Sequence, residues 1–370
     1  MLCRVRVCID IQAAVAQRAG VGRYTKMLAE HLAPQAADDQ LALFHFDFAG
    51  KSRPVASGSA EEKANRWLPR RWVQQCWNRL DWPPFDAFAG PADLYHFPNF
   101  IRPPLRQGKS IVTIHDVSFL RHPETMEAKN YAFLSRQIRQ TVARSDAIIT
   151  DSSFVADEVR ALLSVPREKL FPIHLGLKEY STSTPQQRTH FQSSFGLNRP
   201  YLLHVGTIEP RKNHQLLIEI FEKLDFDGDL VLAGMKGWKC EPIFERIRRS
   251  PAAERIRYID YLPEAHLGDL YRGADAMVFP SLYEGFGLPP LEAMLCGTPV
   301  VSSSAGSLRE VLGNGARLVD GYDPTEWTIA VGEVLNNPSP WIDAGRSVAT
   351  AFRWETTAEK TWALYREVVG

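Results

Sequence analysis

Two glutamates, Glu284 and Glu292, are separated by seven residues within the segment FPSLYEGFGLPPLEAMLCGTPVV (279–301). The apolar run 276–279 is typical of a short buried strand. A pair of prolines after it, followed by Gly297, predicts a helix of about two turns. We therefore expect Glu284 on a loop after a strand and Glu292 in the first turn of the following helix.

The residues between these glutamates favour binding of a polar, anionic ligand. Gly285 and Gly287 carry no Cβ, so backbone amides there can come close to a ligand. Amides at a helix N-terminus favour an anion, and glutamate oxygens accept hydrogen bonds from hydroxyl groups. This combination suits a ligand with phosphates and many hydroxyls, such as a nucleotide-sugar. A capped helix in any α/β protein is the alternative.

A basic pair, Arg211 and Lys212, lies after the apolar run 201–205, in the string GTIEPRKN. Asn213 is expected to cap the helix that follows. Two cations at a strand-to-helix turn would neutralise a diphosphate. A solvated basic pair on the surface is the alternative.

His115 and Asp116 directly follow another apolar run, 109–114. A side chain at the carboxyl end of a parallel strand faces the crevice where ligands bind in such sheets. His115 is therefore a candidate for contact with the reacting sugar, and Asp116 could fix the loop or contact an acceptor. A structural histidine with satisfied hydrogen bonds is the alternative.

Gly20, Val21 and Gly22 open a further expected helix, with Arg23 beside them. The third glycine of a dinucleotide fingerprint is missing, and the turn is long. By its residues alone the loop is either a plain helix entry or a phosphate or substrate loop.

The strings EGFGLPPLEAMLCGTPVV, GTIEPRKN and TIHDVSFLRHPE resemble the retaining glycosyltransferases of family 4, which have the GT-B fold. The resemblance covers nearly the whole chain and is strongest over 201–320. It implies an α/β protein with two Rossmann-like, doubly wound domains facing an interdomain cleft. The acceptor-binding domain would span 1–180 and include the C-terminal helix at about 352–370. The nucleotide-sugar-binding domain would span 195–350.

The same resemblance assigns roles to the candidate residues. Glu284 would bind sugar hydroxyls and act with His115 and Asp116 at the reacting centre, while Glu292 would bind the ribose. The leaving phosphate would take the acceptor's proton on the same face of the sugar. The first glycine loop, Gly20 to Arg23, would approach the donor phosphates or the acceptor. Donor-binding residues would be Gly206, Arg211, Lys212, Tyr261, Leu262, Gly285, Phe286, Gly287, Leu288 and Glu292.

The strings look most like enzymes that transfer mannose or rhamnose from a GDP-sugar in bacterial O-antigen or surface polysaccharide assembly. The acceptor would be a lipid-linked oligosaccharide at the cytoplasmic face of the inner membrane. A UDP-sugar or dTDP-rhamnose remains an alternative donor. The rival functions are a GT-B-fold nucleotide-sugar epimerase or hydrolase, a non-enzymatic binder, and a dinucleotide oxidoreductase. The last lacks a complete glycine fingerprint.

Length and composition agree with a two-domain globular protein. The chain has 370 residues, 45% hydrophobic and 23% charged, which is typical of two packed cores. Zero net charge gives no support to a general nucleic-acid role, although residues 1–175 carry five more basic than acidic residues. No apolar run approaches the roughly 20 residues that span a bilayer, and the N-terminus is too charged and short for a signal peptide.

We expect no cofactor and no metal. The five cysteines show no CxxC spacing, which favours free thiols in a reducing cytoplasm. Asp225 and Asp227 look like a metal-binding DxD motif but fit a tight turn better. The chain is thus expected in the cytoplasm, with peripheral association with the inner membrane left open.

Strands that alternate with helices in both halves predict parallel, doubly wound sheets. The polar stretch 176–198 is expected to join the domains, and 50–65 to form a loop. A helix starting at Pro69 would carry Trp72 and Trp77 on one apolar side, which either packs against the domain or lies at a membrane interface. The segment Ser307–Glu310 predicts a capping box. The tail 351–369 predicts a helix with Trp354, Ala358, Trp362 and Tyr365 on one stripe.

Overall fold

The computed structural model describes residues 4–17, 20–50, 55, 60–260 and 262–370. The chain divides into two compact units. The first contains the residues up to Val117 together with Ala132–Gly176 and Arg353–Gly370, and the second contains Ser118–Tyr131 and Leu177–Phe352.

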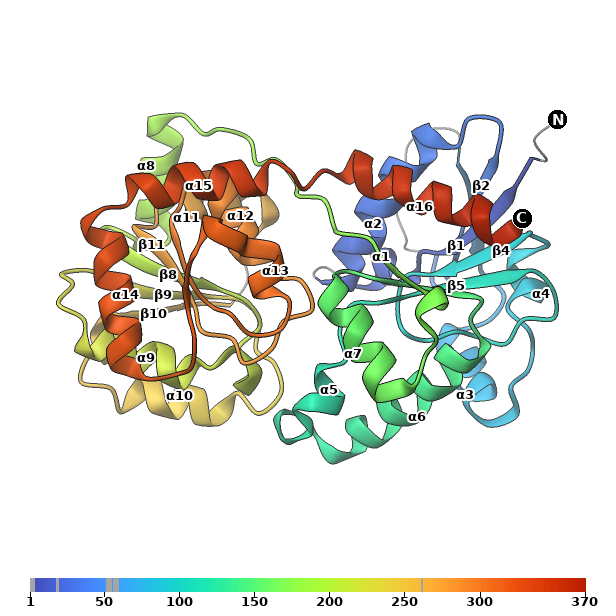
Figure 1. The fold of residues 1–370 in the computed structure, drawn as a ribbon, viewed down its shortest axis with the longest axis horizontal. Helices are drawn as coiled ribbons and strands as arrows, with labels where there is room; N and C mark the ends of the chain where they lie inside the picture. The colour runs from blue at the N-terminus through green and yellow to red at the C-terminus, as the bar shows by residue number, and fades with distance from the viewer. Residues whose placement is uncertain (1–3, 18–19, 51–54, 56–59, 261) are drawn as a thin grey trace. The chain divides into compact units, whose positions relative to one another are not determined.

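The first unit is built on a parallel sheet of seven strands in the order β3-β2-β1-β4-β5-β6-β7 (Figure 1). Its central strands are almost continuously apolar and buried, as expected for a parallel sheet covered by helices. The strands are β1 (Arg6–Asp10), β2 (Gln40–Phe46), β3 (Glu61–Asn65), β4 (Leu94–Phe97), β5 (Lys109–Ile114), β6 (Ala147–Thr150) and β7 (Leu170–Pro172). The helices are α1 (Gln12–Ala16), α2 (Val21–Leu32), α3 (Arg70–Leu80), α4 (Asp86–Ala89), α6 (Ala128–Arg144), α7 (Ser153–Leu163) and α16 (Trp354–Val369).

Helix α16 is the last helix along the chain, yet it packs into the first unit beside α2 (Figure 1). The predicted stripe of Trp354, Ala358, Trp362 and Tyr365 is confirmed, because all four side chains are buried. The Trp362 indole Nε1 donates a hydrogen bond to the Leu32 carbonyl oxygen at 3.0 Å. The stripe therefore fixes this helix by both apolar burial and a directed polar contact.

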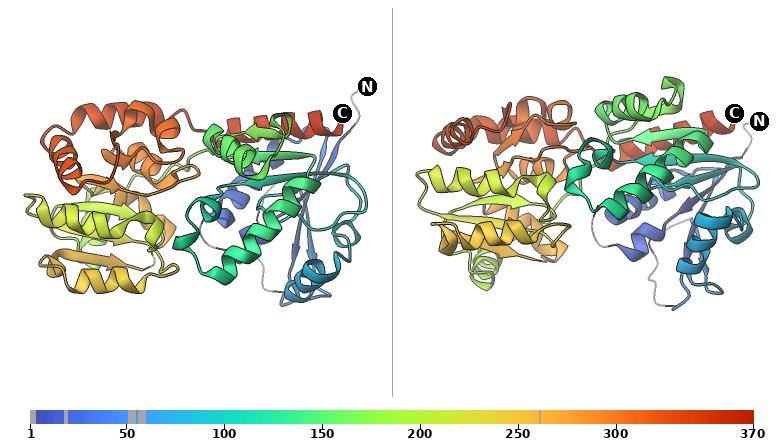
Figure 2. Two further views of the ribbon diagram at one scale, coloured as in Figure 1. Left: turned by 60° about the horizontal axis from the view of Figure 1, so that its bottom comes forward. Right: turned by 90° about the horizontal axis from the view of Figure 1, so that it is seen from below.

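The second unit holds a parallel sheet of six strands in the order β10-β9-β8-β11-β12-β13. Figure 2 shows helices on both faces of this sheet. The strands are β8 (Tyr201–Val205), β9 (Asp229–Ala233), β10 (Ile256–Ile259), β11 (Ala276–Phe279), β12 (Val300–Ser303) and β13 (Arg317–Val319). The helices are α5 (Ser118–Arg121), α8 (Pro185–Ser194), α9 (His214–Lys223), α10 (Glu241–Arg248), α11 (Glu264–Arg272), α12 (Leu288–Cys296), α13 (Leu308–Leu312), α14 (Pro324–Asn336) and α15 (Ser339–Ala349).

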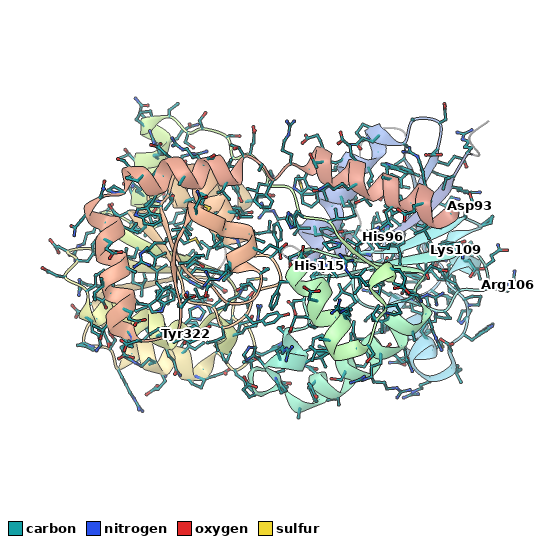
Figure 3. All side chains as sticks on the ribbon, in the orientation of Figure 1. Asp93, His96, Arg106, Lys109, His115 and Tyr322 are labelled. Carbon is teal, nitrogen blue, oxygen red and sulfur yellow. The ribbon has the colours of Figure 1, made fainter. Side chains whose placement is uncertain are left out.

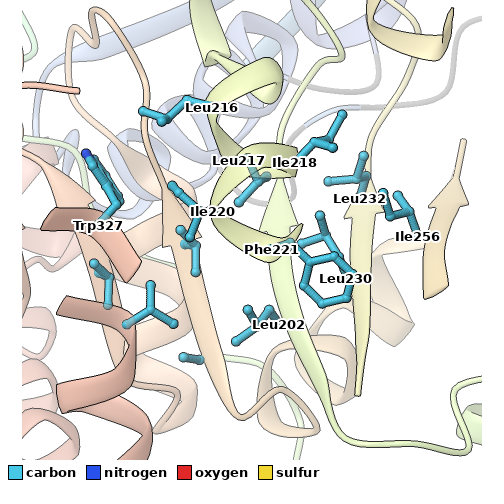
Figure 4. Close-up of a cluster of buried hydrophobic side chains, with 14 of the residues drawn as sticks. Leu202, Leu216, Leu217, Ile218, Ile220, Phe221, Leu230, Leu232, Ile256 and Trp327 are labelled. Carbon is cyan, nitrogen blue, oxygen red and sulfur yellow. The ribbon is translucent and has the colours of Figure 1, made fainter. Parts of the chain in front are cut away.

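One apolar cluster forms the core on one side of this second sheet (Figure 4). Phe221 and its neighbours on α9 pack with Leu202 on β8, Leu230 on β9 and Trp327 on α14. Burying such large side chains stabilises the unit by about 25 cal/mol for each Å² of apolar surface removed from water. This core holds β8 and the neighbouring β11 in place.

Two expectations for the first unit are wrong. The stretch 50–65 is not all loop, because Glu61–Asn65 forms the edge strand β3 paired with β2. The hydrophobic pattern did not indicate this strand, because its residues are mostly polar and only partly buried. The predicted single apolar side of α3 is also wrong, because Trp72 is 57% exposed whereas the neighbouring Val73 is buried and Trp77 is partly buried. The apolar residues of α3 therefore lie on more than one side of the helix.

Replacing Trp362 with alanine is expected to destabilise the first unit by about 3–5 kcal/mol, because a fully buried indole leaves a cavity and the Leu32 carbonyl loses its donor. Denaturant unfolding followed by circular dichroism measures the change. Trp67→Ala is the control, since Trp67 is largely exposed and its loss should change stability by less than about 0.5 kcal/mol. Equal effects of the two substitutions would contradict this account of α16.

Candidate active site

The two predicted donor-binding segments of the second unit follow the carboxyl ends of two neighbouring central strands of its sheet. Strands β8 and β11 are neighbours, and the strand order reverses between them. The short helix Pro210–Lys212 follows β8, and the loop carrying Glu284 follows β11. The carboxyl ends of strands at such a switch point are where open α/β sheets bind their ligands.

The predicted basic pair and the first glutamate form one cluster. The Lys212 Nζ donates to Glu284 Oε1 at 2.6 Å, and Arg211 Nη1 contacts Glu284 Oε2 at 3.3 Å. Arg211 also donates through Nη1 to the Tyr283 carbonyl oxygen at 2.7 Å and through Nη2 to Glu209 Oε1 at 2.8 Å. The charged atoms of two cations and two carboxylates therefore lie within a few ångströms of one another.

Glu284 is ionised in this arrangement although it is buried. Burial by itself would raise the pKa of Glu284, but the charges of Lys212 and Arg211 and their hydrogen bonds hold that pKa below its usual range. Removing one member would leave its partner as an uncompensated buried charge, which is strongly destabilising. The charged groups of the cluster are thus held in place, and an anionic ligand could replace a carboxylate as the partner of Lys212 and Arg211.

Residues that sequence reasoning missed hold the backbone of Glu284. The Ser307 amide donates to the Glu284 carbonyl oxygen at 2.9 Å, and the Ser307 hydroxyl donates to the same oxygen at 3.1 Å. Gly306 has φ +64°, and a Cβ there would lie 2.3 Å from that oxygen. The predicted capping box at Ser307 is wrong, because its side chain makes no cap hydrogen bond and binds the Glu284 loop instead.

Glycine is required at the start of the next helix. Gly287 precedes α12 in the left-handed region with φ +98°, and a Cβ there would lie 2.6 Å from Leu308 Cδ2. Any other residue would be strained and would clash. Leu288 is the first residue of α12 and is partly buried, while Gly285 and Phe286 on the loop before it are buried.

The second glutamate makes a contact of its own. Glu292 is the fifth residue of α12, so it lies in the second turn rather than the predicted first turn. It is buried, and its Oε2 accepts a hydrogen bond from the Tyr271 hydroxyl at 2.8 Å. Tyr271 lies on α11, 21 residues earlier, and no motif pointed to it.

The other donor-binding candidates are placed by the same strands. Gly206 follows β8 directly, and its amide donates to the Ala233 carbonyl oxygen at 2.9 Å. Leu262 lies between β10 and α11 and is partly exposed. Tyr261 lies outside the described residues. Asn213 occupies the position before α9 in the left-handed region, but its side chain makes no cap hydrogen bond, so the predicted cap is wrong.

In the first unit, His115 follows β5 as predicted and lies between two acceptors. Its Nδ1 is 2.8 Å from Asp151 Oδ2, and its Nε2 is 3.1 Å from the Pro98 carbonyl oxygen. Burial alone would lower the pKa of His115, but the Asp151 carboxylate and these hydrogen bonds raise it. An imidazolium donates from both nitrogens, so the surroundings favour the charged form.

A second histidine nearby is kept neutral. His96, on β4, is fully buried, with Nδ1 2.6 Å from the Tyr365 hydroxyl and Nε2 2.8 Å from Thr113 Oγ1. Burial, and then the charge of His115, lowers the pKa of His96 to about 3. Figure 3 shows both histidines in the first unit. His96 was missed because its polar partners come from α16 and β5.

The remaining candidates of the first unit lie at helix entries and strand ends. Gly20 precedes α2 in the left-handed region with φ +59°. Val21 and Gly22 begin that helix, and Arg23 on its first turn is partly exposed. Asp116 follows His115 and is partly exposed as well.

Two of the pockets lined by described residues of the first unit lie at opposite ends of its strands. A cavity of about 40 Å³ lies at the carboxyl ends of β1 and β4 and is lined by Asp10, Gln74 and Trp77 among others. A larger, open pocket of about 870 Å³ lies at the opposite ends of the strands, beside Asp93 and Lys109 (Figure 3). The smaller cavity is the relevant one, because it lies at the carboxyl ends.

Within the described ranges, no group of three or more His, Cys, Asp or Glu side chains could hold a metal ion. Asp227 pairs instead with Arg199, and Asp229 pairs with Arg257. Asp227 of the DxD-like string thus forms an ion pair just before β9, and Asp229 forms one at the first position of that strand.

The family models match both halves of the chain. Residues 18–178 match "Glycosyltransferase Family 4", and residues 185–348 match "Glycosyl transferases group 1". An O-antigen chain mannosyltransferase B from Escherichia coli is 29% identical over 94% of this chain and 96% of its own length. The chain belongs to the GT-B glycosyltransferases.

Solved structures agree with this fold. This glycosyltransferase is similar to sucrose-phosphate synthase from Thermosynechococcus elongatus, with a TM-score of 0.77 and 20% identity over 98% of this chain and 99% of that one. It is also similar to Anabaena HepE in complex with UDP-glucose, with a TM-score of 0.71 and 16% identity over 98% of this chain and all of that one. The predicted α/β fold class of two parallel sheets is confirmed.

The Asp151→Asn glycosyltransferase is expected to have a His115 pKa below the ordinary 6.5, because burial remains while the carboxylate is lost. A raised pKa contributes stability below the unfolded-state value, and that contribution is lost as pH rises through the folded-state value. Histidine Cε1–H resonances followed by NMR against pH measure the shift. Asp157→Asn, at an exposed position of α7, is the control. An unchanged His115 titration in Asp151→Asn would contradict the assigned cause.

Proposed function

We propose that this glycosyltransferase is a retaining hexosyltransferase that moves mannose or rhamnose from a GDP-sugar to a lipid-linked oligosaccharide during bacterial surface polysaccharide assembly. The observation that carries the proposal is the cluster of Arg211, Lys212 and Glu284 at the switch point of the second sheet. The mannose donor and O-antigen type of product are supported by the relative named for that activity.

Arg211 and Lys212 are proposed to bind the diphosphate of the donor. Breaking the anomeric C–O bond places negative charge on the leaving diphosphate, and donors held in position beforehand stabilise it without reorganising. Lys212 and Arg211 already sit within 2.6 Å and 3.3 Å of carboxylate oxygens of Glu284, so an arriving phosphate oxygen would meet cations already in place. The amides of Phe286, Gly287 and Leu288 are proposed to add hydrogen bonds.

Glu284 is proposed to bind hydroxyls of the transferred sugar, and Glu292 the ribose of the nucleotide. Tyr271 donates to Glu292 Oε2 at 2.8 Å, which would orient the other oxygen toward a ligand. Gly206, Leu262 and Gly285 are proposed to line the same site, and Tyr261 the nucleotide base. No nucleophilic carboxylate is needed, because the leaving phosphate can take the acceptor's proton on the same face of the sugar.

The acceptor is proposed to bind the first unit. His115 would donate from Nε2, now facing the Pro98 carbonyl oxygen, to a sugar hydroxyl, with Asp116 beside it. The loop from Gly20 to Arg23 would approach either the donor phosphates or the acceptor. We propose that the protein works at the cytoplasmic face of the inner membrane. Among the described residues, no helix has the length and apolar character needed to cross a bilayer.

Glu284→Gln is expected to reduce kcat for transfer from GDP-mannose by about 10²–10³, the usual cost of one lost interaction with the reacting centre. Product formation on a lipid-linked acceptor is followed by mass spectrometry, and NMR of the product reports the anomeric configuration. Glu333→Gln, which breaks the surface pair with Arg317, is the control and should keep full activity. Donor consumed equally fast without acceptor would identify a hydrolase or epimerase instead.

GDP is expected to raise the melting temperature more than UDP, ADP or dTDP, because a ligand that binds only the folded state stabilises it by about 2.7 kcal/mol at one hundred times its Kd. Thermal shift with each nucleoside diphosphate measures the preference. Arg211→Gln should lose most of the shift, whereas Arg317→Gln should retain it. A larger shift with UDP would favour a UDP-sugar donor, as in the HepE complex.

A further inference from the structure

A group of large apolar side chains around α3 is exposed to solvent. Trp67 is 87% exposed, Trp72 57%, Leu80 70% and Trp82 64%. Single exposed apolar residues are normal on proteins, but a group of this size marks an interaction surface. All four lie within 16 residues of sequence, in the first unit.

Helix α3 places Trp72 and Arg79 on one exposed side. Val73 is buried and marks the inner side of the helix. Trp72 and Arg79 are seven residues apart, or two helical turns, so they share one side, and both are exposed. Trp67 lies just before the helix and Trp82 just after it. We name the exposed group Trp67, Trp72, Leu80 and Trp82, together with Arg66, Arg71 and Arg79, the Trp–Arg surface.

The charge on and around this surface is mostly positive, although Lys63 is paired with Glu61 at 3.2 Å. Residues 63–80 contain five basic residues and no acidic one. The neighbouring part of α6, residues 132–144, contains three arginines and no acidic residue. The nearby acidic Asp81 is already paired with Arg144 at 2.8 Å. The surface therefore offers excess positive charge to a partner.

Helix α6 extends the same surface. The Gln137 amide donates to Asn78 Oδ1 on α3 at 3.2 Å, so the two helices lie side by side (Figure 1). Phe133 lies one turn before Gln137 on that side of α6 and is 40% exposed. A further exposed aromatic ring thus lies on the helix next to α3.

We propose that the Trp–Arg surface docks onto an anionic phospholipid bilayer. Tryptophan rings favour the headgroup level of a membrane, because the ring is apolar while its N–H group can hydrogen-bond to water or headgroups. Arginines beside them are attracted to anionic lipids, and each basic side chain near the surface adds to binding. Tryptophan and arginine are enriched in protein–protein interfaces as well, but an excess of positive charge over two neighbouring helices matches the extended negative charge of an anionic bilayer.

The inner side of α3 lines a cavity, so docking would bring that cavity close to the membrane. Arg70, Gln74 and Trp77 line the 40 Å³ cavity together with Asp10, at the carboxyl end of β1. Burial raises the pKa of Asp10, and the charge of Arg70 lowers it. One helix thus separates the lipid-facing surface from the ligand-binding edge of the first sheet. This use, but not the docking itself, rests on the proposed lipid-linked acceptor.

The test is co-sedimentation of the full chain with vesicles, without donor or acceptor. Wild type should bind phosphatidylcholine vesicles that contain phosphatidylglycerol, bind pure phosphatidylcholine vesicles much less, and be released by salt. Arg71→Gln/Arg79→Gln should bind the anionic vesicles about 30-fold more weakly. Trp67→Ser/Trp72→Ser should also lose most binding, because the rings no longer insert.

The matched control removes an exposed apolar side chain and an exposed arginine from the second unit, in Ile329→Ser/Arg249→Gln, and should bind like wild type. Circular dichroism should show all variants folded, as expected for exposed positions. Wild type that stays in the supernatant with anionic vesicles would overturn the proposal. So would a dimer, seen by light scattering, that the tryptophan substitutions dissociate. Neither result bears on sugar transfer, which is assayed separately.

Discussion

The buried ion pair between Lys212 and Glu284 is the constraint on which the second unit depends. Both side chains are almost fully removed from water, which is tolerable only while each charge meets the other. The pair exists because β8 and β11 are neighbours, so the residues after each strand meet although 72 positions separate them in sequence. The apolar core under the sheet supplies the stability that this polar arrangement does not.

Hydrogen bonds from neighbouring loops hold the backbone around that pair. Ser307 holds the Glu284 carbonyl oxygen from the loop after β12, and Gly306 allows the two loops to touch. Arg211 adds a bond to the Tyr283 carbonyl oxygen. Three strand ends thus share one small network. The two histidines of the first unit differ in a similar way: the Asp151 carboxylate raises the pKa of His115, whereas burial lowers the pKa of His96, whose partners are hydroxyls.

Much of this architecture could be predicted from the sequence, because it is encoded locally. Apolar runs marked the strands, and the glycines around Glu284 marked a loop that only glycine can form. Partners supplied from a distance could not be found this way. Tyr271, Ser307 and His96 acquire their contacts only when remote strands are adjacent. Trp72 was misplaced because the apolar residues of α3 lie on more than one side of the helix, whereas the prediction placed them on one.

Helix α16 has a consequence for how the protein is made. Its indole and phenol rings complete the core of the first unit, yet Trp354–Val369 follows every other element in the chain. During synthesis, the strands of the first unit emerge early but must wait, with an uncovered apolar face beside α2, until translation of the second unit is over. Until then, the exposed apolar face makes the incomplete chain prone to aggregation.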